Sequence, residues 1–386
     1  MIRVTHVIPG LEVGGAELML TRLANGMDRA RFSNTVISLT GIGPAAEVLG
    51  SQGIQVRALG MGRIPNPQAI ARLVSWLRAE SPDVVQTWLY AADFLGGLAA
   101  TLAGTKAIVW NLRQLAPVQP HFAARHVWAG RACGLLSRRL PTAVVCCSEE
   151  VRRSHEALGY VRGRYAVIPN GFDLEVFGPD RAASASVRAE LGVDTTTELI
   201  GMVARFDPVK GHADFFKAAT LISRSKPNTH FLLSGEGMAP TNDAVASMVN
   251  APELQGRVHL LGRRNDVPRL LAALDVAVSA SHSEGFPNTV GEAMASAVPC
   301  VVTDVGGSAS LVGEAGSVVP PHAPPVMANA VLFLLGLGHA GRSEVGAAAR
   351  RRIELLYSLP AMIDQYSLLY ESLVQVTRSH PTMCQA

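Results

Sequence analysis

This sequence of 386 residues lacks the features that mark membrane-spanning, secreted and zinc-binding proteins. No run of about 18 apolar residues, the length that spans a membrane, occurs, and the longest candidate covers only 328–338. The N-terminal stretch MIRVTHVIPG lacks the apolar core and cleavage site of a secretory signal and is typical of a first strand. We therefore expect a cytoplasmic protein, with any membrane contact limited to the periphery of the inner face.

Cysteine is also sparse. The five cysteines are odd in number and lack the spacing of a zinc site; they are Cys133, Cys146, Cys147, Cys300 and Cys384. Neither a Gly-x-Gly-x-x-Gly fingerprint nor a P-loop follows the first strand, which disfavours a dinucleotide-dependent oxidoreductase. We expect reduced, buried thiols, and neither a bound metal nor another cofactor.

The hydrophobic fraction of 48% and the charged fraction of 17% indicate a folded chain with ample core. The length is too great for one ordinary core. Pro169, Asn170 and Gly171 interrupt the regular pattern, and a polar stretch follows to 186. We place a domain boundary there. We predict an N-terminal domain at 1–173, a second domain at 174–360, and a C-terminal helix at 361–386 that packs back toward the first domain.

The formal charge is +3 overall, but it is divided unevenly: residues 1–175 carry +6 and residues 176–386 carry −3. A basic first half favours an anionic partner, such as phospholipid headgroups or a diphosphate-bearing acceptor. No nucleic-acid-binding motif accompanies this charge, so nucleic acid is not the expected partner. The basic segment 125–139 could rest on an anionic membrane or be an ordinary solvated helix face.

Apolar strands alternate with amphipathic helices along both halves, which predicts two doubly wound parallel sheets of the Rossmann type. In such sheets, ligands bind at the carboxyl ends of the strands. In the first half, four polar or aromatic residues follow predicted strands and are candidates for acceptor binding, with packing into the domain wall as the alternative reading: Trp88, Tyr90, Asn111 and Arg113.

The stretch 278–307, VSASHSEGFPNTVGEAMASAVPCVVTDVGG, organises the second half. A strand is followed by a loop with Glu284, and Pro287 can take the first position of a helix that carries Glu292. Both glutamates can then face a ligand at the helix N-terminus, whose N–H groups and dipole suit phosphate.

Two other turns offer groups for an anion. Gly14 and Gly15 join the first strand to a helix and can form a backbone concavity, although a tight packing turn is equally consistent with them. Arg205 and Lys210 flank a turn after another strand, where two cations suit a diphosphate, or form an unremarkable surface pair. We expect these turns to face one inter-domain cleft.

The segments EGFPNTVGEAMASAVPCVVTDVGG, MVARFDPVKG, VIPNGFD and GGAE resemble the retaining glycosyltransferases of family 4, which have the GT-B fold of two Rossmann-like domains. The similarity covers nearly the whole chain, and its most specific part is the pair of glutamates. The resemblance implies transfer of a sugar from a nucleotide-diphosphate sugar, with UDP expected, to a glycan or lipid-linked acceptor in the biosynthesis of surface polysaccharide or glycoconjugates.

The resemblance also implies residue roles. Glu284 would contact the sugar hydroxyls, Glu292 the ribose hydroxyls, and Arg205 and Lys210 the diphosphate. We therefore take Glu284, Arg205 and Lys210 as catalytic, and the expected donor-binding residues are Gly15, Gly262, Arg263, Phe286, Pro287, Asn288, Thr289 and Glu292. No Asp-x-Asp motif occurs, which agrees with catalysis that does not require a metal.

One departure concerns the acceptor side. Family members often carry histidine in the segment corresponding to QTWLYAAD at 86–93 and after WNLR, where this chain has Ala91 and Gln114. Other groups, such as His121 or Asp93, could handle the acceptor hydroxyl. A nucleotide-sugar epimerase or hydrolase on the same fold, and a non-catalytic subunit that binds nucleotide sugar, therefore remain alternatives.

Overall fold

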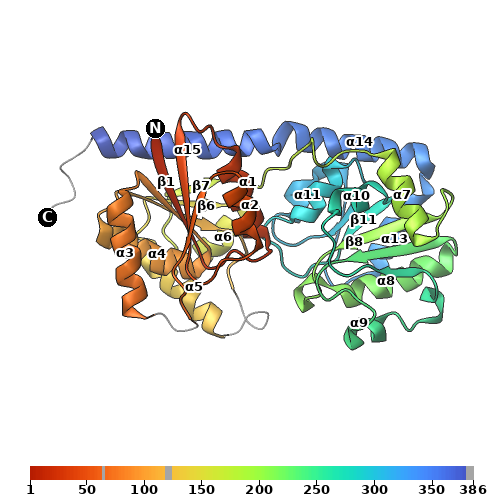
Figure 1. Cartoon of the computed structure of the whole chain (residues 1–386). Helices are drawn as coiled ribbons and strands as arrows, with labels where there is room; N and C mark the ends of the chain where they lie inside the picture. The colour runs from red at the N-terminus through yellow and green to blue at the C-terminus, as the bar shows by residue number, and fades with distance from the viewer. Residues whose placement is uncertain (63–65, 118–123, 380–386) are drawn as a thin grey trace. The chain divides into compact units, whose positions relative to one another are not determined.

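A computed structural model describes residues 1–62, 66–117 and 124–379. The contacts divide the chain into two compact units, here called unit 1 (Met1–Gly171 with Leu359–Ala386) and unit 2 (Phe172–Ser358). The predicted boundaries at 173 and 360 lie two residues beyond those of the structure. Both units are parallel α/β sheets with helices on both faces (Figure 1), which confirms the predicted fold class.

Unit 1 contains a seven-stranded sheet in the order β3-β2-β1-β4-β5-β6-β7, with every neighbouring pair parallel. The order reverses between β1 and β4, so the sheet is doubly wound as predicted. The strands are β1 (Ile2–Ile8), β2 (Phe32–Ser38), β3 (Gln55–Ala58), β4 (Val84–Trp88), β5 (Ala107–Leu112), β6 (Ala143–Cys146) and β7 (Tyr165–Val167).

Seven helices of the described part of unit 1 cover its sheet: α1 (Gly15–Gly26), α2 (Pro44–Ser51), α3 (Pro67–Glu80), α4 (Leu89–Ala103), α5 (Ala124–Leu136), α6 (Glu149–Leu158) and α15 (Leu359–Ser379). The C-terminal helix α15 buries Met362, Tyr366 and Tyr370 in the same core as α1. The Tyr370 hydroxyl donates to Gln86 Oε1 at 2.6 Å, which fixes α15 to β4.

Unit 2 contains a six-stranded parallel sheet in the order β10-β9-β8-β11-β12-β13, which reverses between β8 and β11. Its strands are β8 (Glu198–Val203), β9 (Thr229–Ser234), β10 (Val258–Leu260), β11 (Val276–Ser279), β12 (Cys300–Thr303) and β13 (Ser317–Val319). Its α-helices are α7 (Arg181–Leu191), α8 (His212–Ser225), α9 (Asp243–Met248), α10 (Val267–Ala272), α11 (Asn288–Ala295), α12 (Ser308–Val312), α13 (Pro324–Gly336) and α14 (Gly338–Leu356).

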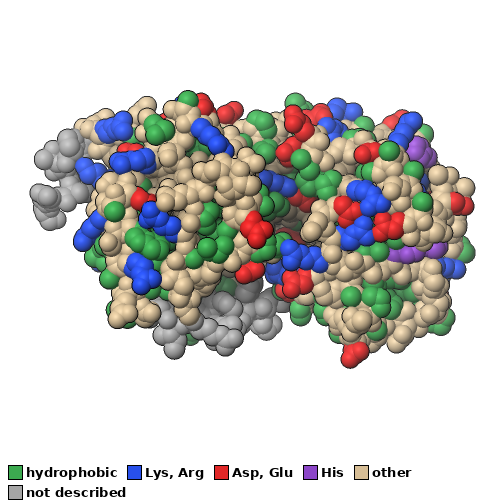
Figure 2. All heavy atoms as spheres, viewed as in Figure 1, with side chains coloured by type: hydrophobic (Ala, Val, Ile, Leu, Met, Phe, Trp, Pro, Cys, Tyr) green, Lys and Arg blue, Asp and Glu red, His purple; other side chains and the backbone are tan. Residues whose placement is uncertain are grey.

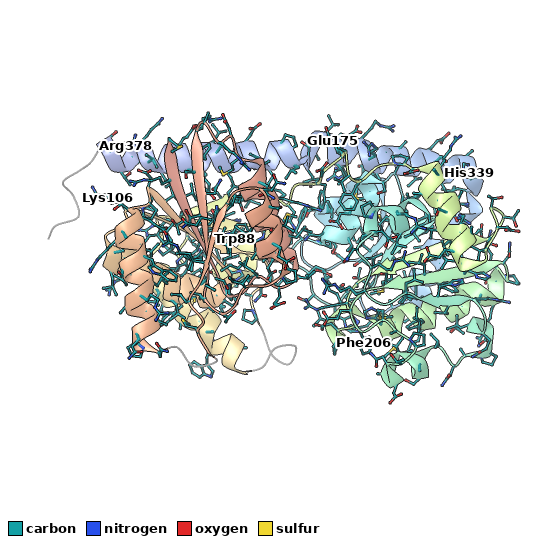
Figure 3. The ribbon with its side chains drawn as sticks, viewed as in Figure 1. Trp88, Lys106, Glu175, Phe206, His339 and Arg378 are labelled. Carbon is teal, nitrogen blue, oxygen red and sulfur yellow. The ribbon has the colours of Figure 1, made fainter. Side chains whose placement is uncertain are left out.

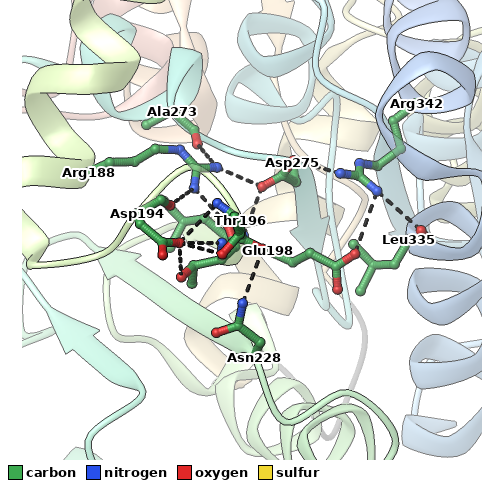
Figure 4. Close-up of polar contacts among 11 residues, drawn as sticks. Arg188, Asp194, Thr196, Glu198, Asn228, Ala273, Asp275, Leu335 and Arg342 are labelled. Carbon is green, nitrogen blue, oxygen red and sulfur yellow. Dashed lines mark hydrogen bonds and ion pairs between the residues drawn. The ribbon is translucent and has the colours of Figure 1, made fainter.

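A buried ionic cluster holds the amino ends of the two switch-point strands of unit 2 (Figure 4). The Asp275 carboxylate, directly before β11, accepts hydrogen bonds from Arg188 at 2.7 Å, Arg342 at 3.0 Å and the Leu199 N–H at 2.9 Å. Each buried charge thereby has an opposite charge and hydrogen-bond partners, as burial requires. The cluster fixes β8 beside β11 at the sheet edge opposite their carboxyl ends.

Ion pairs also join helices on the surface of unit 2. Figure 2 shows adjoining basic and acidic side chains near α7, and Arg264 and Arg269 form ion pairs with Glu190 and Asp266 at 2.6–3.0 Å. These contacts attach α7 to α10. Because the pairs lie at the surface, solvent screens them and their contribution to stability is small.

The four cysteines among the described residues are buried and form no disulfide, as predicted: Cys133, Cys146, Cys147 and Cys300. Cys384 lies outside the described residues. Burial raises the pKa of the Cys300 thiol to about 12, so this side chain is an uncharged part of the core.

No single helix in the described ranges combines the length and the apolar composition of a membrane span; α13 and α14, bent by 109° where they meet, do so only as a pair.

Candidate donor-binding site at the switch point of unit 2

The site is built from the loops that follow β8 and β11, the two strands between which the sheet order reverses. Parallel α/β sheets bind ligands in the crevice outside the carboxyl ends of such a strand pair. The loop after β8 carries Arg205 and Lys210, and the loop after β11 carries Glu284. Lys210 and Glu284 are 74 positions apart in the chain, and the topology brings their loops to one edge.

Lys210 and Glu284 form the centre of this site. Lys210 Nζ lies 2.6 Å from Glu284 Oε1, and the Ser281 hydroxyl donates to the same oxygen at 2.6 Å. The side chains of Lys210 and Glu284 are 25% and 11% exposed, so the pair is partly shielded from water yet open to a ligand. Sequence reasoning missed Ser281, whose only signal is its position three residues before Glu284.

The backbone around Lys210 is shaped by Asp207 and Gly211. Asp207 caps a short 3-10 turn, η1 (Pro208–Lys210), by accepting from the Val209 N–H at 3.0 Å. Gly211 has φ +70°, and a Cβ there would lie 2.0 Å from the Ala280 carbonyl oxygen. Only glycine allows this approach, which also lets the His282 N–H donate to the Val209 carbonyl at 2.7 Å. The two loops are thus joined through their backbones.

A second glycine seats the Glu284 loop. Gly306, in the GG turn after β12, has φ +52°, and a Cβ there would lie 1.7 Å from the Glu284 carbonyl oxygen. The next residue, Gly307, donates its N–H to the Gly285 carbonyl at 3.0 Å. Gly306 and Gly307, which end the 278–307 stretch, therefore hold the Glu284 loop in place through its backbone.

Arg205 is placed differently from Lys210. Its side chain is 60% exposed and lies 3.2 Å from Asp207 Oδ2. Partial burial raises the pKa of Asp207, but the Val209 N–H and the Arg205 guanidinium outweigh it and hold that pKa below its usual range. Asp207 is therefore an anion at neutral pH, and Arg205 is an exposed cation beside the Lys210 turn.

Helix α11 begins at Asn288, so Pro287 is its N-cap residue and not its first helical residue as predicted. Pro287 has extended backbone angles, which a residue preceding the first helical turn adopts. Thr289 lies in the first turn, and Glu292 lies one turn into the helix and is buried. Phe286 stacks on Phe172, with ring centroids 6.4 Å apart.

The turn expected to contact the base follows β10. Gly262 has φ +61°; its N–H donates to the Met238 carbonyl, and its own carbonyl accepts from the Gly235 N–H. Arg263 beside it is exposed. Gly15, the remaining donor-binding prediction, is the first residue of α1 in unit 1, with Gly14 as N-cap.

Two of the residues predicted for the acceptor side lie within strands and not after them. Trp88 and Asn111 were expected just beyond β4 and β5, but they lie within these strands and are fully buried. Figure 3 shows Trp88 among the strands of unit 1. The Trp88 indole donates to His6 Nδ1 at 3.3 Å, and the Asn111 amide donates to the Tyr366 hydroxyl at 3.0 Å. Both side chains pack within unit 1, which supports the packing alternative.

Tyr90 is also buried, and its hydroxyl lies 2.6 Å from His155 Nε2. Because His155 Nδ1 lies 2.8 Å from the Val151 carbonyl, which can only accept, Nε2 must accept from Tyr90. Arg113 is half-buried; it bonds to Asn170 and lies over the Trp88 ring at 5.7 Å. Of the four predicted acceptor residues, Arg113 alone keeps a charged group near the surface.

The two alternative acceptor groups have different outcomes. Asp93 is fully buried, and the Thr87 hydroxyl donates to it at 2.6 Å. Burial raises the pKa of Asp93 well above its usual range. The carboxyl is part of the core and cannot reach an acceptor. His121 lies outside the described residues.

Comparison with known proteins identifies relatives of both halves. Residues 13–176 match the family model described as Glycosyltransferase Family 4, and residues 197–336 match the model described as Glycosyl transferases group 1. The protein of Bacillus subtilis (strain 168) named "Putative glycosyltransferase EpsF" is 30% identical over 315 residues, which cover 78% of this chain and 79% of EpsF.

A second relative is the UDP-Gal:alpha-D-GlcNAc-diphosphoundecaprenol alpha-1,3-galactosyltransferase of Escherichia coli. It is 29% identical over 255 residues, which cover 64% of this chain and 65% of the relative. Among solved structures, HepE of Anabaena in complex with UDP-glucose superposes with a TM-score of 0.84 at 22% identity, covering 96% of this chain and 100% of HepE. Nearly the whole of this chain therefore has the same fold as HepE.

Proposed function

Because this chain belongs to glycosyltransferase family 4, we propose that it is a retaining, metal-independent transferase that uses a UDP-sugar. The acceptor is a glycan or a lipid-linked saccharide in the biosynthesis of surface polysaccharide or glycoconjugates. Two names support the choice of substrates: the Escherichia coli relative uses UDP-Gal and an acceptor linked to diphosphoundecaprenol, and HepE binds UDP-glucose. The two parallel sheets of the Rossmann type, which the GT-B fold contains, agree with this activity.

The contact between Lys210 and Glu284 at the switch point carries the proposal. Lys210 has three N–H donors, so it can keep Glu284 in place while also donating to a phosphate oxygen. Both hydrogen bonds from Lys210 and Ser281 end on Glu284 Oε1. Oε2 of the same carboxylate is then directed to hydroxyl groups of the donor sugar.

Neighbouring residues of unit 2 supply the other proposed contacts with the donor. Arg205 turns from Asp207 toward the diphosphate, which offers two negative charges in place of one. The N-terminus of α11, from Phe286 to Thr289, adds its dipole to the phosphate site. Glu292 accepts from the ribose hydroxyls, and Gly262 and Arg263 contact the base.

These groups account for the chemistry. Breaking the bond between sugar C1 and the diphosphate oxygen leaves negative charge on the nucleotide and positive character on the sugar. Lys210, Arg205 and the helix dipole stabilise the leaving diphosphate, a role that a metal fills in other enzymes. Glu284 orients the sugar, and orientation of this kind lowers the barrier without proton transfer.

A surface on α5 supports peripheral contact with the inner face of the cell membrane. Trp128 and Leu135 are exposed there, next to the exposed cations Arg131 and Arg138. The Arg131 guanidinium lies over the Trp128 ring at 5.8 Å. Exposed aromatic and aliphatic side chains can insert into a membrane interface, and neighbouring arginines are attracted to anionic lipids. Cosedimentation with anionic and with neutral vesicles tests this contact; binding to anionic vesicles that Trp128→Ser leaves unchanged would contradict it.

The decisive experiment measures release of UDP from a panel of UDP-sugars, chosen first by ligand-induced stabilisation of the protein. We expect release in the presence of acceptor for the wild type and for the control Lys106→Ala, which removes an exposed lysine of unit 1. Glu284→Ala and Lys210→Ala should abolish it. Full activity of both variants would refute the site assignment.

The same assay separates the alternatives. An epimerase or hydrolase would turn over the donor without an acceptor. A non-catalytic subunit would bind UDP-sugar in calorimetry and release no UDP with any acceptor. Activity that persists in EDTA supports metal independence, and the anomeric configuration of the product, read by NMR, tests retention.

A further inference from the structure

Beside the donor site, two imidazoles converge on one carboxylate. His282 Nε2 lies 2.9 Å from Asp214 Oδ2, and His322 Nδ1 lies 3.3 Å from the same oxygen. The two imidazole rings approach each other, with centroids 3.9 Å apart. Within the ranges that the structure describes, this is a group of three potential metal ligands whose ligand atoms all lie within 4.8 Å of one another.

Three separate segments of unit 2 supply these ligands. Asp214 is in the first turn of α8, His282 is in the loop after β11, and His322 is in the turn between β13 and α13. His322 has φ +57°, a backbone conformation that few non-glycine residues adopt. The arrangement therefore depends on tertiary structure and could not be recognised from the spacing of the three residues in the sequence.

The distances suit a small divalent ion. Ligands at about 2.0–2.1 Å from a tetrahedral zinc ion are about 3.3–3.4 Å apart. The separation of 3.3 Å between His322 and Asp214 meets this value, and the 2.9 Å separation of His282 requires a shift of about 0.4 Å. A metal could thus take the place of the hydrogen atoms between Asp214 and the two histidines, whose own ligand atoms lie within 4.8 Å of each other.

Burial also fits a metal site. The Asp214 and His282 side chains are 12% and 19% exposed, whereas His322 is 60% exposed. Two ligands are thus held by the surrounding protein, and the third lies at the surface, where an ion can enter. Three protein ligands leave the fourth position of a tetrahedron for water.

From this geometry we propose that Asp214, His282 and His322 form a zinc site. Two imidazole nitrogens and one carboxylate oxygen match the donor preferences of zinc, whereas magnesium and calcium prefer oxygen ligands alone. Lys217 Nζ lies 3.8 Å from Asp214 Oδ1, on the oxygen that the histidines do not contact. This exposed lysine leaves Oδ2 to the metal.

The site would restrain the loops that carry the donor-binding residues. His282 is two residues before Glu284, Asp214 is four residues after Lys210, and the two loops already share the hydrogen bond from His282 N–H to the Val209 carbonyl. A zinc ion would cross-link the start of α8 to the Glu284 loop. It would clamp these two loops together and would take no part in sugar transfer, so the inference holds whether or not the proposed function is correct.

The test measures binding of zinc alone to full-length protein from which any histidine tag has been removed. Calorimetry and elemental analysis should find one zinc per chain, and magnesium should not compete. His322→Ala removes the exposed ligand and should weaken zinc binding at least 100-fold, because each ligand contributes strongly to metal affinity. The matched control His339→Ala removes an exposed histidine on α14 (Figure 3) and should bind zinc as the wild type does.

A second pair of histidines tests whether zinc binds at the proposed site or elsewhere. His230 Nδ1 and His259 Nε2 lie 2.9 Å apart on neighbouring strands β9 and β10. The proposal is overturned if the wild type binds no zinc at tens of micromolar, if His322→Ala binds as tightly as the wild type, or if His259→Ala removes the binding instead. Hydrogen exchange in the 280–284 loop should slow on addition of zinc to the wild type and not to His322→Ala.

Discussion

Lys210 Nζ and Glu284 Oε1 lie 2.6 Å apart, although the two residues are separated by 74 positions in the chain. Lys210 ends the short turn after β8, and Glu284 lies in the loop after β11. Their contact spans the point where the strand order of unit 2 reverses. Under the proposed function, this ion pair holds one group for a diphosphate beside one for a sugar.

Removing either member of this pair should destabilise unit 2. Lys210→Met or Glu284→Gln leaves the other group partly buried without its partner, and we expect a loss of about 1–2 kcal/mol in the free energy of unfolding, less than for a fully buried pair. In the double variant the two losses should not add, because neither charge remains unpaired. Calorimetric unfolding of the three variants checks this; additive losses would contradict a direct interaction.

Gly211 provides a test of the backbone contact between the two loops. Gly211→Ala places a Cβ 2.0 Å from the Ala280 carbonyl oxygen, so the turn that carries Lys210 must move. Gly192→Ala is the matched control, since Gly192 has φ +68° and a Cβ there would meet open space. We expect the control to lose about 1–2 kcal/mol from backbone strain alone.

Gly211→Ala should lose more stability than the control and also bind UDP at least tenfold more weakly, as measured by calorimetry. If both variants bound UDP equally well, the position of the Lys210 turn would not matter for the nucleotide.

Glu292 should distinguish nucleotides by their ribose hydroxyls. Glu292→Gln keeps the size of this buried side chain but removes its charge, and hydrogen bonds to charged groups contribute about 1.5–3 kcal/mol. We therefore expect UDP to bind roughly 10- to 100-fold more weakly to the variant. The nucleotide that lacks both ribose hydroxyls, 2′,3′-dideoxy-UDP, should bind equally to the variant and the wild type. A loss of the same size for both nucleotides would assign Glu292 a different role.

His6 should make unit 1 less stable in acid. The Trp88 indole can only donate, so His6 Nδ1 accepts from it and Nε2 donates to Asn34 at 3.1 Å. Both ring nitrogens are thus satisfied in the neutral form. Burial lowers the pKa of His6 from 6.5 to about 4, with the hydrogen bond to Asn34 opposing the shift.

The direction in which His6 changes the stability with pH follows from proton binding. Between pH 6.5 and 4, the unfolded chain binds a proton at His6 that the folded protein does not, so stability is highest above pH 6.5 and falls toward pH 4. Burial likewise lowers the pKa of His155 to about 4, which adds to the loss, whereas burial raises the pKa of Asp93, which opposes it. The shift at His6 corresponds to about 3 kcal/mol.

His6→Gln can keep both hydrogen bonds without titrating. The difference in unfolding free energy between pH 7 and pH 4.5 should therefore be smaller in His6→Gln than in the wild type by about 2–3 kcal/mol. All four tryptophans lie in unit 1, so tryptophan fluorescence during urea unfolding reports this unit. The control His339→Gln should keep the wild-type dependence, and an unchanged dependence in His6→Gln would argue against a buried neutral histidine.

The acceptor side shows where prediction from sequence is weakest. Asn111 and Trp88 were expected to follow their strands, but β5 extends to Leu112 and β4 includes Trp88. An error of one or two residues at a strand end decides whether a side chain faces a ligand or the core. For Trp88 and Asn111 the core was the outcome, because His6 and Tyr366 supply their hydrogen-bond partners from other elements.

The sequence by itself determined the alternation of strands and helices, the two parallel sheets and the loop that carries Glu284, since hydrophobic periodicity and the Gly and Pro positions are local signals. Tertiary structure alone decided which side chains meet. Ser281 reaches Glu284, and Asp214 gathers His282 and His322, only because parallel strands place distant loops at one edge of a sheet. These contacts depend on strand order and on close backbone approach at Gly211 and Gly306, and neither is encoded in the spacing of residues along the chain.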